Sequence, residues 1–129
     1  MKTRMLLFLA LLLTGCAVLA LAQEANTYRR ISMQEVVEMM HKEEGYIILD
    51  VRTEQEYAAG HIPGAIVIPN ETIGAQEIPQ LPDKDQLIMV YCRSGNRSKQ
   101  ASDKLVKLGY TNIVEFGGII DWPGEIVVD

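Results

Sequence analysis

The sequence is poor in cysteine, histidine and aromatic residues, and these shortages exclude several classes of protein. Its 129 residues include two cysteines, and only Cys92 lies outside the apolar N-terminal segment, which rules out a disulfide-stapled fold for the remainder. One cysteine and two scattered histidines have no metal-ligand spacing, so we expect no metal site. Twelve basic against 17 acidic residues give a net charge of −5, which makes nucleic acid an unexpected partner.

Long apolar runs are absent except at the N-terminus. Between Met5 and Ala22 only Thr14 and Gly15 fall outside the apolar set, and the basic Lys2 and Arg4 precede this run. The run ends in a small-x-small triplet, so residues 1–22 are predicted to be a signal peptide. Its removal leaves 107 residues at a net charge of −7, enough for one domain at 28–129.

Two alternatives remain open for the N-terminal segment. Leu13–Cys16 resembles the lipobox of bacterial lipoproteins, which would make 1–15 the signal and Cys16 a lipidated first residue. An uncleaved anchor is the other alternative, because about 18 apolar residues can just span a bilayer. All three interpretations predict export, to a periplasmic, secreted or cell-surface location, with membrane contact only through this segment. The exported domain is expected to be a monomer.

Beyond residue 28, short apolar runs alternate with helix-like stretches. Strands are predicted at 46–51, 66–68, 87–91 and 112–116, and helices from 33 to just before Gly45, at 54–59 and at 98–108. Residues 69–86 contain three prolines and are predicted to be mostly loop, with a helical turn. Strands that are apolar on both faces and alternate with helices indicate an α/β fold with a covered parallel sheet.

Cys92 directly follows the most apolar strand, where reactive groups gather in parallel sheets. The next six residues are polar and include Gly95 and Asn96, which tolerate left-handed backbone conformations. A loop that curls around a helix N-terminus points its N–H groups inward and can stabilise a thiolate. The pattern therefore favours covalent chemistry at sulfur. The alternative is that Cys92 is only a small buried apolar residue.

Four segments resemble the single-domain rhodaneses, the thiosulfate sulfurtransferases. These are the loop Cys92–Ser98, the segment Leu49–Ala65 with its Asp-Val-Arg and Gly-His-Ile-Pro-Gly-Ala motifs, Leu108–Tyr110 and Gly117–Trp122. The resemblance implies a rhodanese fold, with a five-stranded parallel sheet flanked by helices on both faces. It also implies that Cys92 takes a sulfane sulfur from a donor such as thiosulfate, becomes a persulfide, and passes the sulfur to a thiol or to cyanide. No cofactor other than this covalent persulfide is expected.

The resemblance also assigns roles to the residues around Cys92. The backbone of the loop would stabilise the sulfur anion, and its arginines would attract the anionic donor; the loop residues are Arg93, Ser94, Gly95, Asn96, Arg97 and Ser98. A solvated side chain remains open for either arginine, and for Arg97 so does a structural pairing with a nearby carboxylate. Asp50 and Arg52 are expected to support the site as scaffolding, in which Asp50 could bond the loop backbone or Arg97, and direct contact of the pair with the substrate remains the alternative. His61 is expected to fasten the turn before Pro63.

Three other functions are compatible with parts of this pattern. Related phosphatases and arsenate reductases use a Cys-x5-Arg loop, whereas Cys92 and Arg97 are separated by four residues, which fits a smaller, sulfur-centred site. Rhodanese-like domains also serve as non-catalytic interaction modules, often with the cysteine replaced, but Cys92 is retained here. The third alternative is a sulfur relay, in which a partner protein rather than thiosulfate delivers the sulfur.

Overall fold

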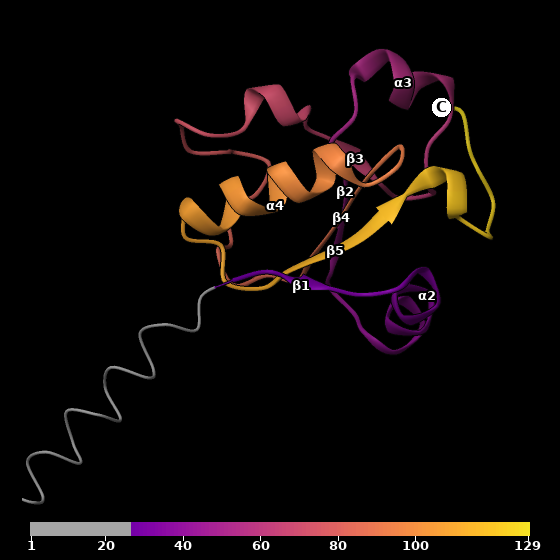
Figure 1. The fold of residues 1–129 in the computed structure, drawn as a ribbon, viewed down its shortest axis with the longest axis horizontal. Coiled ribbons are helices and arrows are strands. Elements are labelled where there is room, and N and C mark those ends of the chain that lie inside the picture. Colours follow the sequence, from indigo (N-terminus) through magenta and orange to yellow (C-terminus); the bar gives the residue numbers. More distant parts are fainter. Residues whose placement is uncertain (1–26) are drawn as a thin grey trace, which may run out of the picture.

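The computed structural model describes residues 27–129, which form a five-stranded sheet (Figure 1). Its strands are β1 (Arg29–Arg30), β2 (Ile47–Asp50), β3 (Ile66–Val67), β4 (Ile88–Cys92) and β5 (Ile113–Gly118). All pairs are parallel, in the order β1-β5-β4-β2-β3. The α/β class and the five-stranded parallel sheet are thus confirmed. The alternatives for residues 1–22 lie outside the described residues.

Two of the three α-helices within residues 27–129 begin at side-chain caps. The helices are α2 (Met33–Lys42), α3 (Glu54–Ala59) and α4 (Asn96–Lys107), with the 3₁₀ turns η1 (Asn70–Thr72) and η2 (Ile119–Asp121). Thr53 and Glu56 form a complete capping box at α3. At α2 only half of the box forms, since the Ser32 hydroxyl accepts from the N–H of Glu35 and no reciprocal bond is present.

The start of α4 differs from the sequence-based prediction. The helix begins at Asn96, two residues before the expected Ser98, and within the loop 93–95 only Gly95 has a left-handed backbone, with φ of +114°. Asn96 was also expected to tolerate that conformation, but it is helical. One glycine is therefore enough to turn the chain from β4 into α4, and the connecting loop is correspondingly tight.

Two apolar layers cover the two faces of the sheet. Side chains alternate along β4, so Val90 and Cys92 pack in one core cluster with Leu105 of α4. Met89 and Tyr91 point the other way, into a second cluster that includes Val36 of α2. Figure 1 shows α4 and α2 on opposite sides of the sheet. This alternation decides which buried polar groups can reach Cys92.

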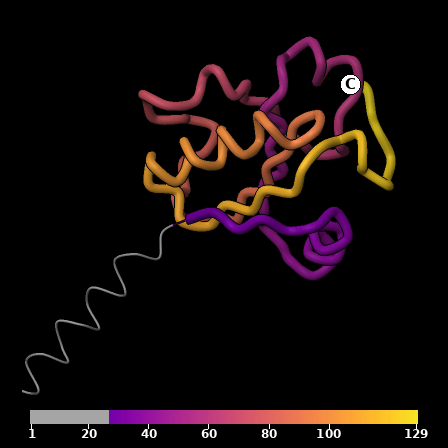
Figure 2. The backbone as a smooth tube through the Cα atoms, viewed as in Figure 1, coloured from indigo at the N-terminus to yellow at the C-terminus, as the bar shows by residue number. Residues whose placement is uncertain are grey.

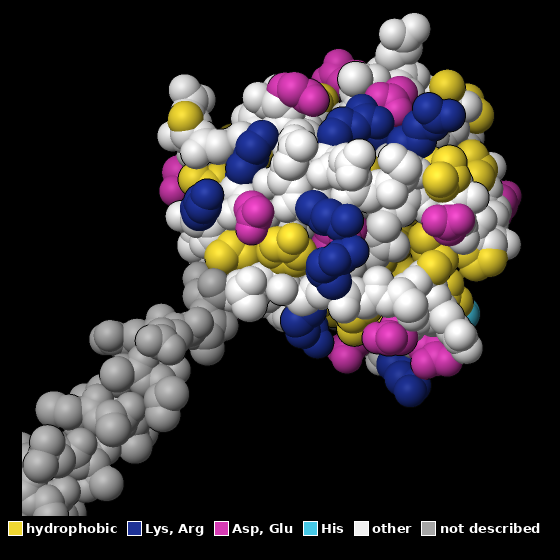
Figure 3. Space-filling view, in the orientation of Figure 1, with side chains coloured by type: hydrophobic (Ala, Val, Ile, Leu, Met, Phe, Trp, Pro, Cys, Tyr) yellow, Lys and Arg dark blue, Asp and Glu magenta, His cyan; other side chains and the backbone are white. Residues whose placement is uncertain are grey.

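The surface carries both signs of charge. In Figure 3, Lys and Arg side chains are interspersed with Asp and Glu on the face in view.

The edge strand β1 has both of its residues exposed and no apolar pattern, so its place in the sheet was implied only by the family resemblance. Within residues 27–129, no helix has the length and apolar character needed to cross a membrane.

Candidate active site

Cys92 is the last residue of β4, and the loop 93–95 carries the chain from it into α4. The tube in Figure 2 shows this turn beside the segment that follows β5. The Cys92 residue is only 1% exposed, and it is a free cysteine among residues 27–129. It sits at the carboxyl end of a central strand, flanked by β5 and β2. The fold thus places the thiol where an α/β sheet presents its reactive groups.

Hydrogen-bond donors of the loop converge on the sulfur of Cys92. The N–H of Gly95 lies 3.0 Å from Sγ, and the Ser98 Oγ atom lies 3.4 Å from it. Burial by itself raises the pKa of the Cys92 thiol, but hydrogen bonds from the Ser98 hydroxyl and from loop N–H groups outweigh burial and lower that pKa below its ordinary value. The arrangement favours a thiolate, which is the nucleophilic form of cysteine.

The first loop residue is held against the end of β5. The carbonyl oxygen of Arg93 accepts from the N–H of Ile120 at 3.3 Å. A Cβ atom at Gly118 would lie 1.9 Å from that same oxygen, so only glycine allows the two backbones to approach this closely. The Cα of Gly117 lies 3.8 Å from the position of a Cβ on Gly95. The Gly-Gly pair at the end of β5 is therefore a packing surface for the Cys92 loop.

Arg97 forms an ion pair rather than standing free over the sulfur. Its two terminal nitrogens lie 2.7 and 3.0 Å from the two carboxylate oxygens of Glu56 in α3. The hydrogen bond from Arg97 lowers the pKa of Glu56 to about 2, and bonds from Thr53 act in the same direction against partial burial. Of the alternatives left open for Arg97, the geometry therefore favours structural pairing with a carboxylate.

The other loop residues differ in how they meet solvent. Arg93, Ser94 and Asn96 are exposed, whereas Gly95 and Ser98 are buried. The loop thus carries an exposed arginine, Arg93, directly after the buried Cys92 in the chain.

The expectation that Asp50 bonds the loop or Arg97 is wrong. Asp50 is fully buried and accepts from the backbone N–H, Nε and NH2 groups of Arg52 and from the hydroxyl of Tyr91. Arg52 also donates to the carbonyl of Gly60 at 2.8 Å. Because Asp50 is paired in register with Tyr91, both side chains face the α2 side, away from the Cys92 side chain. The Asp50–Arg52 pair therefore ties β2 to the turn after α3.

His61 is bound within the fold on both ring nitrogens. Its Nδ1 lies 2.8 Å from the carbonyl of Tyr57, its Nε2 lies 3.1 Å from Asp129, and its ring stacks on that of Tyr57 at 3.7 Å. Its backbone also pairs with Val127. These contacts agree with the expected fastening of the turn before Pro63.

Sequence reasoning missed one polar neighbour of the site. Glu115 of β5 is 2% exposed, and its Oε2 lies 2.9 Å from the Ser98 hydroxyl and 2.6 Å from the N–H of Gly117. A charged residue inside the apolar strand that precedes Gly117 was the available signal. Glu115 thus approaches the site through Ser98.

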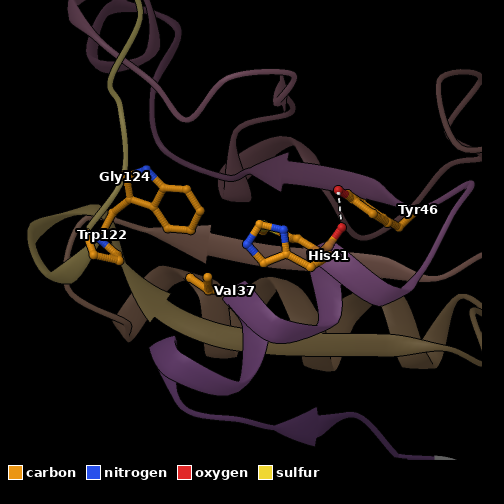
Figure 4. A pocket seen from close by; sticks show the side chains of 7 residues that line it. Val37, His41, Tyr46, Trp122 and Gly124 are labelled. Atoms are coloured by element: carbon orange, nitrogen blue, oxygen red, sulfur yellow. Dashed lines mark hydrogen bonds between the residues drawn. The ribbon is translucent and has the colours of Figure 1, made fainter.

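A separate apolar pocket lies between α2 and the segment after η2. It has a volume of about 460 Å³, and the rings of Trp122 and His41 face it from opposite sides, with Val37 between them (Figure 4). Tyr46 donates from its hydroxyl to the carbonyl of Met40 at the rim. Trp122 packs in the α2-side core cluster and donates from Nε1 to the carbonyl of Glu125. The pocket contains no cysteine or carboxylate, and we assign it no chemistry.

The sequence and the fold of this chain are both similar to those of known proteins. The family model described as Rhodanese-like domain matches residues 32–124. The chain is 37% identical over 73 residues to "Thiosulfate sulfurtransferase PspE" of Escherichia coli, covering 57% of this chain and 70% of that one. It is 34% identical over 105 residues to "Thiosulfate sulfurtransferase GlpE" of Pseudomonas entomophila, covering 78% and 93%. The solved structure "rhodanese with anions from E. coli" superposes with a TM-score of 0.60 at 33% identity, covering 65% and 99%.

Proposed function

Because the chain belongs to the family of rhodanese-like domains, we propose that it is a thiosulfate sulfurtransferase that carries the transferred sulfur as a persulfide on Cys92. The observation that carries this proposal is the convergence of the Gly95 N–H and the Ser98 hydroxyl on a buried sulfur whose pKa is lowered. Such donors stabilise an anion without a metal or another cofactor.

The reaction balances in two steps. The Cys92 thiolate attacks the sulfane sulfur of thiosulfate, so that a new S–S bond forms, the S–S bond of thiosulfate breaks, and sulfite leaves with the electron pair. A thiolate or cyanide then attacks the outer sulfur of the persulfide, and the Cys92 thiolate leaves. The N–H of Gly95 faces the Cys92 sulfur, which is the thiolate nucleophile before the first step and the thiolate leaving group of the second. The exposed Arg93 provides the cation that draws the donor to the loop.

The test is the intact mass of the reduced protein before and after thiosulfate, beside a Cys92→Ser control that retains Cys16. We expect a gain of one sulfur atom that cyanide removes and that the control lacks. If Cys92 stays unmodified although a thiol reagent titrates it, thiosulfate is not the donor, and the sulfur-relay or interaction alternative replaces this proposal.

We also propose that the domain acts after export. The support is the sequence of residues 1–22, with its basic start, apolar centre and small-residue exit. Mass spectrometry of the N-terminus of the native protein tests this: a start at residue 23 fits cleavage, and a lipidated Cys16 fits a lipoprotein. An unprocessed Met1 on protein that fractionates with cytosol would exclude export.

A further inference from the structure

Glu115 is a buried carboxylate for which the transfer reaction has no direct use. The residue is 2% exposed, although ionised carboxylates are seldom buried without a close cation. The cation nearest to it is Arg30, whose Nε lies 3.6 Å from Oε1 and whose side chain is 63% exposed. Asp50 differs, because its carboxylate meets the guanidinium of Arg52 at 2.7 Å. Burial of Glu115 therefore depends on its hydrogen bonds to Ser98 and Gly117.

Ser98 links this carboxylate to the sulfur. Its Oγ lies 2.9 Å from Glu115 Oε2 and 3.4 Å from Cys92 Sγ, and the residue is fully buried. The carbonyls of Gly95 and Gly117 lie 2.9 and 3.4 Å from the same atom. A serine hydroxyl has a single proton to donate. When that proton is directed to Glu115, Ser98 can only accept from the Cys92 thiol; when it is directed to sulfur, Glu115 loses a donor.

We propose that Glu115 is a positioning residue that competes with the Cys92 sulfur for the Ser98 proton and thereby sets the pH at which Cys92 ionises. With Cys92 as a thiol, S–H donates to Ser98 Oγ and the serine proton rests on Glu115. On ionisation the thiol proton leaves to solvent, and the serine proton turns to the thiolate. A negative Glu115 resists that turn both by holding the proton and by its charge, so it raises the pH required for the reactive form.

Three other charged or titratable groups lie near Glu115. Arg30 of β1 attracts its charge, and Asp121 of η2 lines the same surface hollow. Tyr28 has a raised pKa, for which burial is the main cause, with smaller contributions from Asp103 and Glu115. Arg30 is thus the only cation within 4 Å of this carboxylate among the described residues, and it reaches the oxygen that Ser98 does not use.

The test measures thiolate absorbance of the full chain against pH, with Cys92→Ser as the baseline. In Glu115→Gln, the amide oxygen can still accept from Ser98 and from Gly117, but the charge is gone. We expect its midpoint to fall by about one pH unit. Well above both midpoints the two proteins should be equally ionised.

A double-mutant cycle separates competition through Ser98 from a charge acting through space. Ser98→Ala should raise the midpoint, and Glu115→Gln in that background should move it by less than half as much as in the native protein. An equal shift in both backgrounds overturns the proposal, as does no shift in either. Ser102→Ala is the matched control, because Ser102 is equally buried one turn along α4, and its hydroxyl has no hydrogen-bond partner within residues 27–129. It should leave the midpoint unchanged.

A measurement without a substitution at Glu115 covers the case in which that variant does not fold. The ¹³C shift of the Glu115 carboxyl, followed by NMR in the native protein, should show an inflection at the pH where Cys92 ionises. That inflection should be lost in Cys92→Ser, and its absence from the native protein would contradict the coupling. The inference concerns the cysteine of the proposed transfer and rests on that proposal for its catalytic meaning. Neither measurement uses a sulfur donor. The role of Glu115 can therefore be refuted while sulfur transfer by Cys92 is confirmed, and sulfur transfer can be refuted while the role of Glu115 is confirmed.

Discussion

Two buried charged clusters lie at the carboxyl ends of the neighbouring strands β2 and β4, and they are built in opposite ways. Around Asp50 every polar neighbour is paired, with a guanidinium, a phenol and a carbonyl in mutual contact. Around Cys92 the N–H of Gly95 and the hydroxyl of Ser98 meet the sulfur atom, and the guanidinium of Arg97, whose charge reaches that sulfur, is already paired with Glu56. The first cluster is closed and holds elements together, while the second keeps donors available for an incoming anion. Sharing a sheet edge does not make two charged groups parts of one site.

The sharpest test of this contrast removes Asp50. Asp50→Ala leaves the buried Arg52 unpaired and should lower the free energy of unfolding by about 3–5 kcal/mol. Urea denaturation measures it. At low temperature, where the variant stays folded, the ionisation midpoint of Cys92 should equal that of the native protein. Glu77→Ala, which breaks an exposed pair with Lys84, is the control and should cost less than about 0.5 kcal/mol. A change in the Cys92 midpoint on loss of Asp50 would show that the clusters are coupled.

The second test acts on the open cluster through its packing. Gly118→Ala brings a Cβ into the Arg93 carbonyl, so the loop must shift and its N–H groups must move off the sulfur. We expect sulfur uptake from thiosulfate to slow by about tenfold or more, with a stability loss of about 1–3 kcal/mol. Uptake assays quenched at successive times measure the rate of sulfur uptake, and urea titrations measure the free energy of unfolding. Native uptake rates in this variant would mean that the loop tolerates displacement, contrary to the close fit of the two backbones.

The third test compares the two arginines of the loop. Arg93 is exposed, whereas Arg97 is held by Glu56, so Arg93→Gln should raise the KM for the dianion thiosulfate by about fivefold, as loss of roughly 1 kcal/mol of attraction implies. The increase should shrink as salt is added. Arg97→Gln should affect thermal stability more than KM. The reverse pattern would assign substrate attraction to Arg97.

The smallest expected effect is the acid sensitivity of the Glu56–Arg97 pair. Because the folded-state pKa of Glu56 is about 2, against an ordinary 4.5, its stabilisation is complete above pH 4.5 and is lost as the pH falls towards 2. The pair is partly exposed, so we expect about 1 kcal/mol. The free energy of unfolding, measured between pH 6 and pH 2, should fall less steeply in Glu56→Gln than in the native protein. Parallel curves would mean that the pair contributes nothing.

The strand and helix pattern was predictable because the buried strands are largely apolar on both faces and because α2 and α3 have capping side chains at their starts. β1 was not, since two exposed residues carry no periodicity. Asp50 was expected to reach the Cys92 loop because both residues lie at the carboxyl ends of neighbouring strands. That expectation ignored the alternation of side chains between the two faces of the sheet. Asp50 is in register with Tyr91, and Cys92 is one residue further, which points its side chain to the opposite face.

The same alternation could have located Glu115. Glu115 is in register with Val90, and Val90 shares the α4-side cluster with Cys92. The partner of Arg97 could not be found in this way. Glu56 lies 41 residues from Arg97 on a different helix, and no local pattern connects them. Only the folded backbone brings α3 and α4 together.

The fixed first residue of the loop has a consequence for how such loops change length in evolution. The carbonyl of Arg93 is held by the N–H of Ile120 and lies over Gly118, so this end cannot move without rebuilding the end of β5. An inserted residue must therefore be accommodated between Ser94 and Asn96, where the chain is exposed on both sides of Gly95. A lineage could thus widen the anion cradle by a single codon insertion while the sheet, the cysteine and the glycine pair stay in place.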